Sequence, residues 1–275
     1  MKKYELTTDT KIVLGKKLFR IKALVSFGNV KAGDLGGYVE RENNLSHEGD
    51  AWVSGNAKVF DNAKVFDNAE VSGKAWVSGD AKVFDNAKVY GNAKVSGNAK
   101  VYGKALVSGN AKVFDNAWVY GKAWVYGDAE VSGDAEVFGD AKVSGNAKVF
   151  DNAKVFDNAE VSGDAKVSGK AWVSGDAKVF GDAKVYGNAD YTIIQGFGSE
   201  YRNTTFFKCK DGNIGVKCGC FYGTLDEFRS KVKETHKDSK FAKEYLMIAD
   251  LMEYHFNSER KETDEEQNRQ SQEVH

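Results

Sequence analysis

Small and β-branched apolar residues recur at fixed positions through the middle of the chain. From residue 51 to residue 188, the unit Ala-x-Val-x-(Gly/Asp)-(Asn/Asp/Lys) occurs 23 times without an insertion or a deletion. Ala and Val are two residues apart, so both side chains lie on one face of an extended strand, while the intervening positions point outward. The Gly or Asp that follows suits a bend through positive φ. Each unit therefore predicts a short strand and a bend.

A strand of three residues cannot bury its apolar face alone, whereas stacked turns of such strands can. A short fixed period is typical of a solenoid, and three units of six residues form one triangular turn, so that each Val packs on the Val eighteen residues later. An apolar period of 3.6 residues is absent, which argues against helices. We predict an all-β solenoid over residues 51–189, a left-handed parallel β-helix of about 7–8 triangular turns. At ~4.8 Å per turn it is roughly 35–40 Å long.

Residues 1–50 are predicted to form an N-terminal β cap, because a bare end of the coil exposes unpaired strand edges. Residues 16–27 alternate well enough for a strand, with Phe19, Ile21, Ala23 and Val25 on one side. Extending the repeat backwards places Leu45 on the Ala position and His47 on the Val position. We therefore expect His47 to point into the cap.

Residues 190–256 are predicted to form a C-terminal cap of a β-hairpin and two helices. Residues 205–210 and 214–220 flank a good hairpin turn, Asp211-Gly212-Asn213. A capping box at residues 224–227 begins the first helix, and the second is expected from residue 240 to about residue 255. The residues expected to face inward on these helices are Leu225, Phe228, Val232, Phe241, Tyr245, Ile248, Ala249 and Met252. Residues 257–275 are charged and are expected to be a disordered tail or a frayed extension of the second helix.

The charge and cysteine content limit the classes of function. The chain has a net charge of −1, and within residues 51–188 its 17 Lys are balanced by 13 Asp and 4 Glu. Such a surface does not drive general nucleic-acid binding through counterion release. No apolar run is long enough to span a membrane, and the charged start of the chain does not predict a signal peptide. Three cysteines do not suit a secreted disulfide framework, so we expect a cytoplasmic protein.

His47 is the only candidate base close to the coil. Enzymes with this kind of β-helix are known mainly as acyltransferases, an expectation that rests on fold analogy, and their chemistry needs a base to deprotonate the acceptor. The 23 units contain no His, no Cys and no inserted loop. The residues leave enzymatic activity open, favour a non-catalytic protein and imply no cofactor. An acyl-CoA-dependent acyltransferase with a site between subunits stays the alternative.

Four residues of the C-terminal segment could form a zinc site. They are Cys209, Cys218, Cys220 and His236. Their spacing is not a strong zinc signature. Phe207, Cys209, Val216, Cys218 and Cys220 also alternate as inward residues of a small hairpin would. Buried cysteine that fills apolar space is therefore the favoured interpretation, and metal binding is the alternative.

An aromatic column is the most distinctive feature of the outer surface. Taken eighteen residues apart, one column reads Phe66, Phe84, Tyr102, Tyr120, Phe138 and Phe156, followed by Ser174. Such a ladder could form a contact surface for another subunit or a partner, or it could stabilise neighbouring turns within the chain. Lysine precedes Val in 13 of the 23 units, which makes nucleic-acid binding a third, less favoured hypothesis, because Asp in the bends cancels the charge.

Several stretches outside the repeat carry a family resemblance. They are residues 18–24 (LFRIKAL), 33–40 (GDLGGYVE), 44–51 (NLSHEGDA) and 217–224 (KCGCFYGT), with Glu227-Phe228 and Glu244-Tyr245 after them. Together with the repeat, they resemble hexapeptide-repeat proteins of bacteriophages and prophages, related to an acetyltransferase-like β-helix protein of enteric bacteria. The resemblance covers the chain up to about residue 256. It implies a left-handed β-helix with two caps and a place in the cytoplasm of the bacterial host, and it supplies no catalytic residues.

The sequence thus favours a non-catalytic binding or scaffold protein. We expect a homo-oligomer, with a trimer as one form, and a partner that is a host protein or a small host ligand. Acyl transfer and nucleic-acid binding are the two alternatives.

Overall fold

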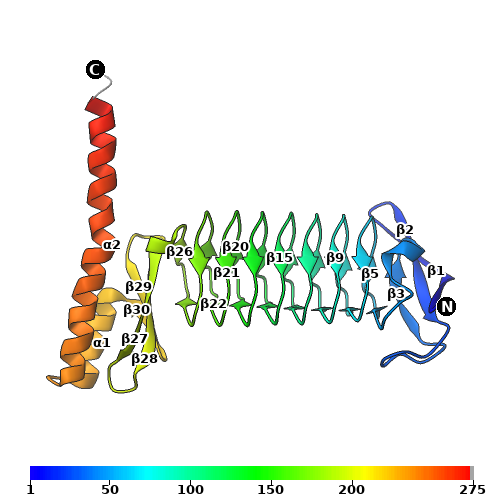
Figure 1. The fold of residues 1–275 in the computed structure, drawn as a ribbon, viewed down its shortest axis with the longest axis horizontal. Coiled ribbons are helices and arrows are strands. Elements are labelled where there is room, and N and C mark those ends of the chain that lie inside the picture. The colour runs from blue at the N-terminus through cyan, green and yellow to red at the C-terminus, as the bar shows by residue number, and fades with distance from the viewer. Residues whose placement is uncertain (273–275) are drawn as a thin grey trace.

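The computed structural model describes the backbone of residues 1–272 and the side chains up to Asn257; residues 273–275 lie outside the described part. Figure 1 shows a straight coil with a small cap of strands at its N-terminal end. A four-stranded sheet closes the other end, and two helices lie across the outer side of that sheet.

The coil consists of 23 two-residue strands, which stack into three parallel sheets. The β4 side contains β4 (Trp52–Val53), β7 (Glu70–Val71), β10 (Lys88–Val89), β13 (Leu106–Val107), β16 (Trp124–Val125), β19 (Lys142–Val143), β22 (Glu160–Val161) and β25 (Lys178–Val179). The β5 side contains β5 (Lys58–Val59), β8 (Trp76–Val77), β11 (Lys94–Val95), β14 (Lys112–Val113), β17 (Glu130–Val131), β20 (Lys148–Val149), β23 (Lys166–Val167) and β26 (Lys184–Val185). The β6 side contains β6 (Lys64–Val65), β9 (Lys82–Val83), β12 (Lys100–Val101), β15 (Trp118–Val119), β18 (Glu136–Val137), β21 (Lys154–Val155) and β24 (Trp172–Val173).

The interior of the coil is made of the repeated Ala and Val. Every one of these side chains is at most 1% exposed, and each Val pairs with the Val one turn later. Backbone hydrogen bonds join successive turns, as from Lys58 N to the Ala75 carbonyl at 2.9 Å. Burial of one Val stabilises the fold by about 1.5–3 kcal/mol before the entropy cost of ordering the chain. The predicted parallel β-solenoid is therefore confirmed, while its left-handed sense stays a prediction.

The N-terminal cap continues the sheet of the β5 side. Strands β1 (Tyr4–Val13), β2 (Lys16–Ala23) and β3 (Leu35–Val39) are antiparallel to one another, and β3 pairs in parallel with β5. The strand expected over residues 16–27 ends at Ala23. The expected inclusion of Val25 in this strand is therefore wrong. Ile21 and Ala23 are buried in the core of the coil and Phe19 is half-buried, while Leu18 is buried in a separate cluster with Tyr38 and Phe60.

The register expected for Leu45 and His47 is also wrong. Leu45, after the short helix η1 (Glu42–Asn44), bridges to Val65 and is buried in the core of the coil. The backbone N–H of Ser46 donates to the Val65 carbonyl at 2.9 Å. Phe66 makes the same bond to Val83 one turn later, at 3.1 Å. Leu45 therefore takes a Val position, and residues 47–50 fill an enlarged corner that holds two residues in the next turn.

A four-stranded antiparallel sheet follows η2 (Asn188–Asp190) and closes the far end of the coil. Its strands are β27 (Tyr191–Phe197), β28 (Arg202–Lys208), β29 (Ile214–Cys218) and β30 (Phe221–Thr224), which confirms the hairpin. Thr224 and Glu227 form the capping box of α1 (Leu225–His236), with Glu227 N donating to Thr224 Oγ1 at 3.3 Å. Helix α2 (Lys240–Gln272) continues well past residue 255, where the second helix was expected to end.

The C-terminal sheet has two apolar faces. Phe207 and Cys209 pack against the core of the coil, whereas Phe206, Val216 and Cys218 pack against the helices. The single inward face expected for Phe207, Cys209, Val216 and Cys218 is therefore wrong, and Cys220 is exposed. On the helices, Leu225, Phe228, Val232, Tyr245, Ile248, Ala249 and Met252 are buried as expected, and Phe241 is half-buried.

Candidate binding surface of the coil

The aromatic column forms a continuous stack along one corner of the coil. Neighbouring rings from Phe66 to Phe156 are 4.8–5.0 Å apart between centroids and within 3–5° of parallel. All six side chains are half-buried. Each ring covers the face of the next, so the stack stabilises the coil by about 0.5–1.5 kcal/mol per pair and presents mainly ring edges outward.

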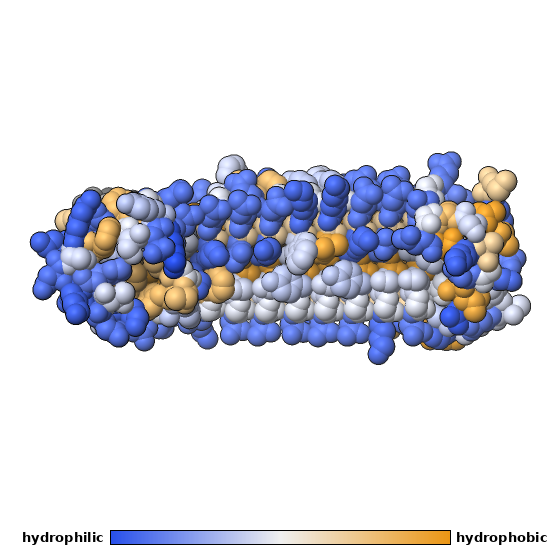
Figure 2. Space-filling view, turned by 90° about the horizontal axis from the view of Figure 1, so that it is seen from below, coloured by the Kyte–Doolittle hydropathy of each residue, from blue (hydrophilic) through white to orange (hydrophobic). Residues whose placement is uncertain are grey.

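Beside this stack runs the outward column of the β6 side, and we call the two columns together the β6 face. Figure 2 shows how rows of hydrophilic side chains run the length of the rod. On the β6 face, Lys100 Nζ lies 4.2 Å from the centre of the Trp118 ring. Lys154 pairs with Glu136 at 2.8 Å. The C-terminal half of the face is thus internally neutralised.

A hydrogen bond ties the stack to this column. Tyr120 Oη donates to Glu136 Oε2 at 2.8 Å. Partial burial, followed by this hydrogen bond, raises the pKa of Tyr120. Partial burial also acts to raise the pKa of Glu136, but the hydrogen bonds from Lys154 and Tyr120 hold it below its ordinary value. Glu136 therefore remains a carboxylate that accepts from both columns.

The N-terminal end of the β6 face is different, because its lysines are unpaired. Neither Lys64 nor Lys82 has an ion-pair or side-chain hydrogen-bond partner among the residues whose side chains are described. Both line a surface hollow of about 660 Å³, together with Ser46, His47 and Phe66. The hollow lies where the stack begins.

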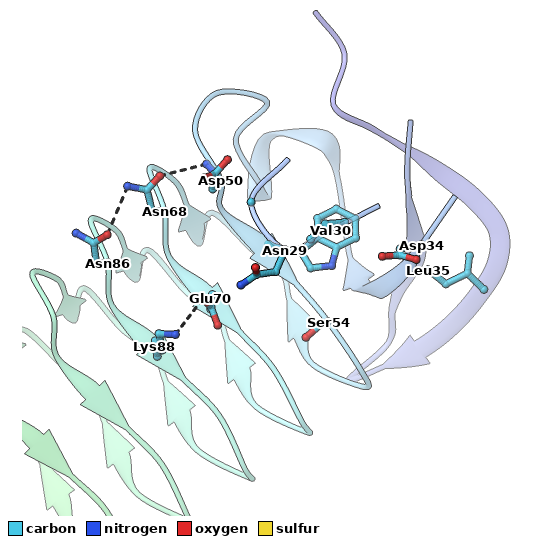
Figure 3. A pocket seen from close by; sticks show the side chains of 12 residues that line it. Asn29, Val30, Asp34, Leu35, Asp50, Ser54, Asn68, Glu70, Asn86 and Lys88 are labelled. Atoms are coloured by element: carbon cyan, nitrogen blue, oxygen red, sulfur yellow. Dashed lines mark hydrogen bonds and ion pairs between the residues drawn. The ribbon is translucent and has the colours of Figure 1, made fainter. Parts of the chain in front are cut away.

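A second hollow, of about 680 Å³, lies on the β4 side beside the loop that precedes β3. Figure 3 shows that its polar side chains are engaged with one another. Lys88 pairs with Glu70 at 3.0 Å, and Asn68 donates to Asn86 at 3.5 Å. Because its lysine is already neutralised, this hollow has less capacity for an anion than the one at Phe66.

His47 is held by the N-terminal cap. Its Nδ1 accepts a hydrogen bond from the backbone N–H of Lys3 at 3.2 Å, and its ring stacks on Tyr4 at 4.5 Å. The neutral ring therefore carries its proton on Nε2, which lies 3.7 Å from Glu42. Glu42 itself pairs with Lys2 at 2.6 Å. Because the lone pair of Nδ1 already accepts the Lys3 N–H, the geometry favours a structural role for His47 over that of a general base.

The four residues considered as zinc ligands lie in two separate places. Cys218, Cys220 and His236 line one apolar hollow of about 290 Å³ between the C-terminal sheet and the helices. Cys209 lies on the other face of the sheet, where burial and then the Asp182 carboxylate raise the pKa of its thiol to about 12. Across the described side chains, no group of three or more His, Cys, Asp or Glu residues is arranged to hold a metal ion.

No protein-family model matches the chain, and a search of curated proteins finds no significant match to its sequence. Among the described residues, none of the helices combines the length and apolar character that a membrane crossing requires.

Sequence reasoning identified the stack but missed the hollow at its N-terminal end. The sequence signal for this hollow is the pair Lys64 and Lys82. The first acidic residue in their outward column is Glu136, so no carboxylate of that column lies next to either lysine. The spacing of eighteen residues does not place Ser46 one turn before Phe66, because the enlarged corner at residues 47–50 adds two residues to this turn.

Proposed function

We propose that this chain is a non-catalytic binding or scaffold protein of a bacteriophage or prophage, which holds a host protein or a small host ligand on the β6 face. The observation that carries the proposal is the stack of six rings beside lysines that have no partner within the described part of the chain. A rigid coil presents these groups at fixed spacing, so little conformational entropy is lost on binding.

The residues near the coil support binding over acyl transfer. The 23 repeats contain neither His nor Cys, and Nδ1 of His47 accepts a hydrogen bond from Lys3 of the N-terminal cap, while Nε2 faces Glu42 at 3.7 Å. An acyltransferase needs a base that can accept a proton from the acceptor group. Calorimetric titration with acetyl-CoA checks this choice, since saturable binding that His47→Ala abolishes would favour the enzyme.

We further propose that the protein acts in the cytoplasm of the bacterial host as a homo-oligomer, with a trimer as one form. The exposed rings of Trp118 and Trp172 support this, because both flank the stack and large aromatic side chains are enriched in protein interfaces.

The test replaces Phe84, Tyr102 and Tyr120 with Ser together. Subunit number by native mass spectrometry and recovery of host partners by pull-down are then compared with the unaltered chain. The matched control replaces Tyr90, Phe114 and Phe150, three aromatic residues at the same repeat position outside the stack. Far-ultraviolet circular dichroism confirms that both variants fold. The proposal fails if the stack variant keeps its oligomeric state and its partners.

A further inference from the structure

We infer that the open N-terminal end of the aromatic stack binds a mononucleotide, with the base on Phe66 and the phosphate on Lys64 and Lys82. This inference deepens the proposed function and rests on it. It follows from what stands at the two ends of the stack and from the charge beside them.

The stack is open at one end and blocked at the other. Ser46 stands in the column one turn before Phe66, where its small side chain leaves the outer side of the Phe66 ring uncovered. At the other end, Trp172 contacts the Phe156 ring edge-on with 6.4 Å between centroids, but Trp118 makes the same contact with Tyr102 inside the stack, so the tryptophan does not itself close this end. Tyr191 of the C-terminal cap occupies this end, since its Oη accepts the backbone N–H of Ser174 at 3.3 Å and donates to the Trp172 carbonyl at 2.7 Å. Only the Phe66 end therefore leaves a place for one more ring in the stack.

The hollow at that end suits an anion that carries a flat ring. Lys64 and Lys82 project from successive strands of the β6 side beside Phe66, and neither is neutralised by a described side chain. The carboxylate of Glu42, which also lines the hollow, is paired with Lys2. A planar base continues the stack through its π face, while the lysines supply the positive charge that a phosphate needs. A volume of about 660 Å³ accommodates a ligand of this size.

Titration of the full chain with AMP tests the inference, with ribose 5-phosphate and adenosine as partial ligands. We expect AMP to bind more tightly than either part, because only AMP uses both the ring and the lysines. Phe66→Ala should weaken AMP binding by at least about fivefold. Phe156→Ala, at the blocked end, should leave it unchanged.

The lysines are tested with the double variant Lys64→Ala/Lys82→Ala, matched by Lys166→Ala/Lys184→Ala on the β5 side. We expect the first pair alone to weaken AMP binding and to reduce its dependence on salt. Equal affinity for AMP and ribose 5-phosphate would overturn the stacking role. An oligoadenylate that binds a hundredfold more tightly than AMP would identify a single strand as the occupant instead.

The failure of this inference can be distinguished from that of the proposed function. If AMP does not bind at millimolar concentration, the nucleotide site is wrong, whereas the β6 face as a partner surface is judged by the Ser variants of the stack. If those variants keep every partner but AMP binding depends on Phe66, the β6 face is not a partner surface, whereas the nucleotide site is supported.

Discussion

The carboxylate of Asp85 accepts a hydrogen bond from the backbone N–H of Gly103, one full turn later, at 3.0 Å. Asp85 lies at the bend of its repeat with φ of 57°, a region that favours glycine. The five other Asp residues at this repeat position have φ of 58–61°, and each accepts a backbone N–H from the following turn. The hydrogen bond offsets the strain of a side chain in the left-handed region.

This relationship predicts that the Asp85→Ala variant is less stable than the Asp85→Gly variant. Asp85→Ala loses the hydrogen bond and keeps a Cβ atom in the left-handed region, so we expect it to lower the free energy of unfolding by about 1–2 kcal/mol. Asp85→Gly loses the same bond but relieves the strain, and should cost less. Urea denaturation of both variants measures the difference. An Ala variant as stable as the Gly variant would contradict this account.

The coil could be predicted from the sequence because each repeat favours the same short strand and bend, and 23 successive copies allow only one register. The two ends could not be predicted in the same way, because the position of a residue there is not supported by equivalent residues at a fixed spacing. Leu45 and His47 are two residues apart, as Ala and Val are, but the enlarged corner puts Leu45 where a Val belongs. Likewise, the C-terminal sheet is sandwiched between the coil and the helices, so consecutive residues such as Phe206 and Phe207 are both buried, on opposite faces.

For the candidate site, too, the sequence predicts what the repeat determines but not what the caps determine. The spacing of eighteen residues predicts that Phe66 and Phe84 stack, since the coil fixes which side chains are neighbours. Which end of the stack is open depends on Ser46 and Tyr191, whose positions are set by the two caps. Those are tertiary contacts that a pattern of residue types does not specify.

The contact between the N-terminal cap and the first turn depends on Gly36. A Cβ atom at this position would meet the Ile21 side chain and would lie 2.6 Å from the Val53 carbonyl oxygen. We therefore expect Gly36→Ala to push β3 away from the coil at a cost of about 1–3 kcal/mol. Limited trypsin digestion should then cut several-fold faster after Lys31, in the exposed loop before β3.

Gly187→Ala is the matched control for this substitution. Gly187 has an extended backbone, and the nearest atom to its added Cβ is Asp190 Oδ2 at 4.0 Å. The control should leave cleavage after Lys31 unchanged. Equal cleavage rates in both variants would show that the close approach at Gly36 does not hold the cap.

The three cysteines should differ in reactivity toward iodoacetamide. Cys220 is exposed, whereas Cys209 is half-buried and its pKa is raised to about 12. At pH 8 roughly one Cys209 side chain in ten thousand is a thiolate, so we expect Cys220 to be modified first and Cys209 far more slowly. Peptide mass spectrometry over time gives the order. In urea the difference should disappear, and a native Cys209 that reacts as fast as Cys220 would refute the packing described for it.

Lys3 should make the N-terminal cap more stable at alkaline pH. Its side chain is only 3% exposed, and Nζ donates to the carbonyls of Gly49 at 3.1 Å and Ala51 at 2.8 Å. Burial lowers the pKa of Lys3 to about 8, although the Asp50 carboxylate acts to raise it. Between pH 8 and about 10 this side chain therefore binds more protons in the unfolded chain than in the folded chain, so its contribution to the free energy of unfolding rises with pH.

We expect the contribution of Lys3 to rise by an amount on the order of 2 kcal/mol, measured by urea denaturation as the difference between the unaltered chain and Lys3→Met across the range. The thiol of Cys209 acts in the opposite direction from about pH 9, because burial raises its pKa from 9.0 to about 12, and the buried hydroxyl of Tyr4, whose pKa is also raised by burial, does so above pH 10. Burial also lowers the pKa of Lys58, which adds a slope of the same sign. The variant Lys3→Met isolates the contribution of Lys3, because it keeps an apolar chain of similar length and removes the titrating group. If Lys3→Met retains the full rise, the buried ammonium of Lys3 is not its source.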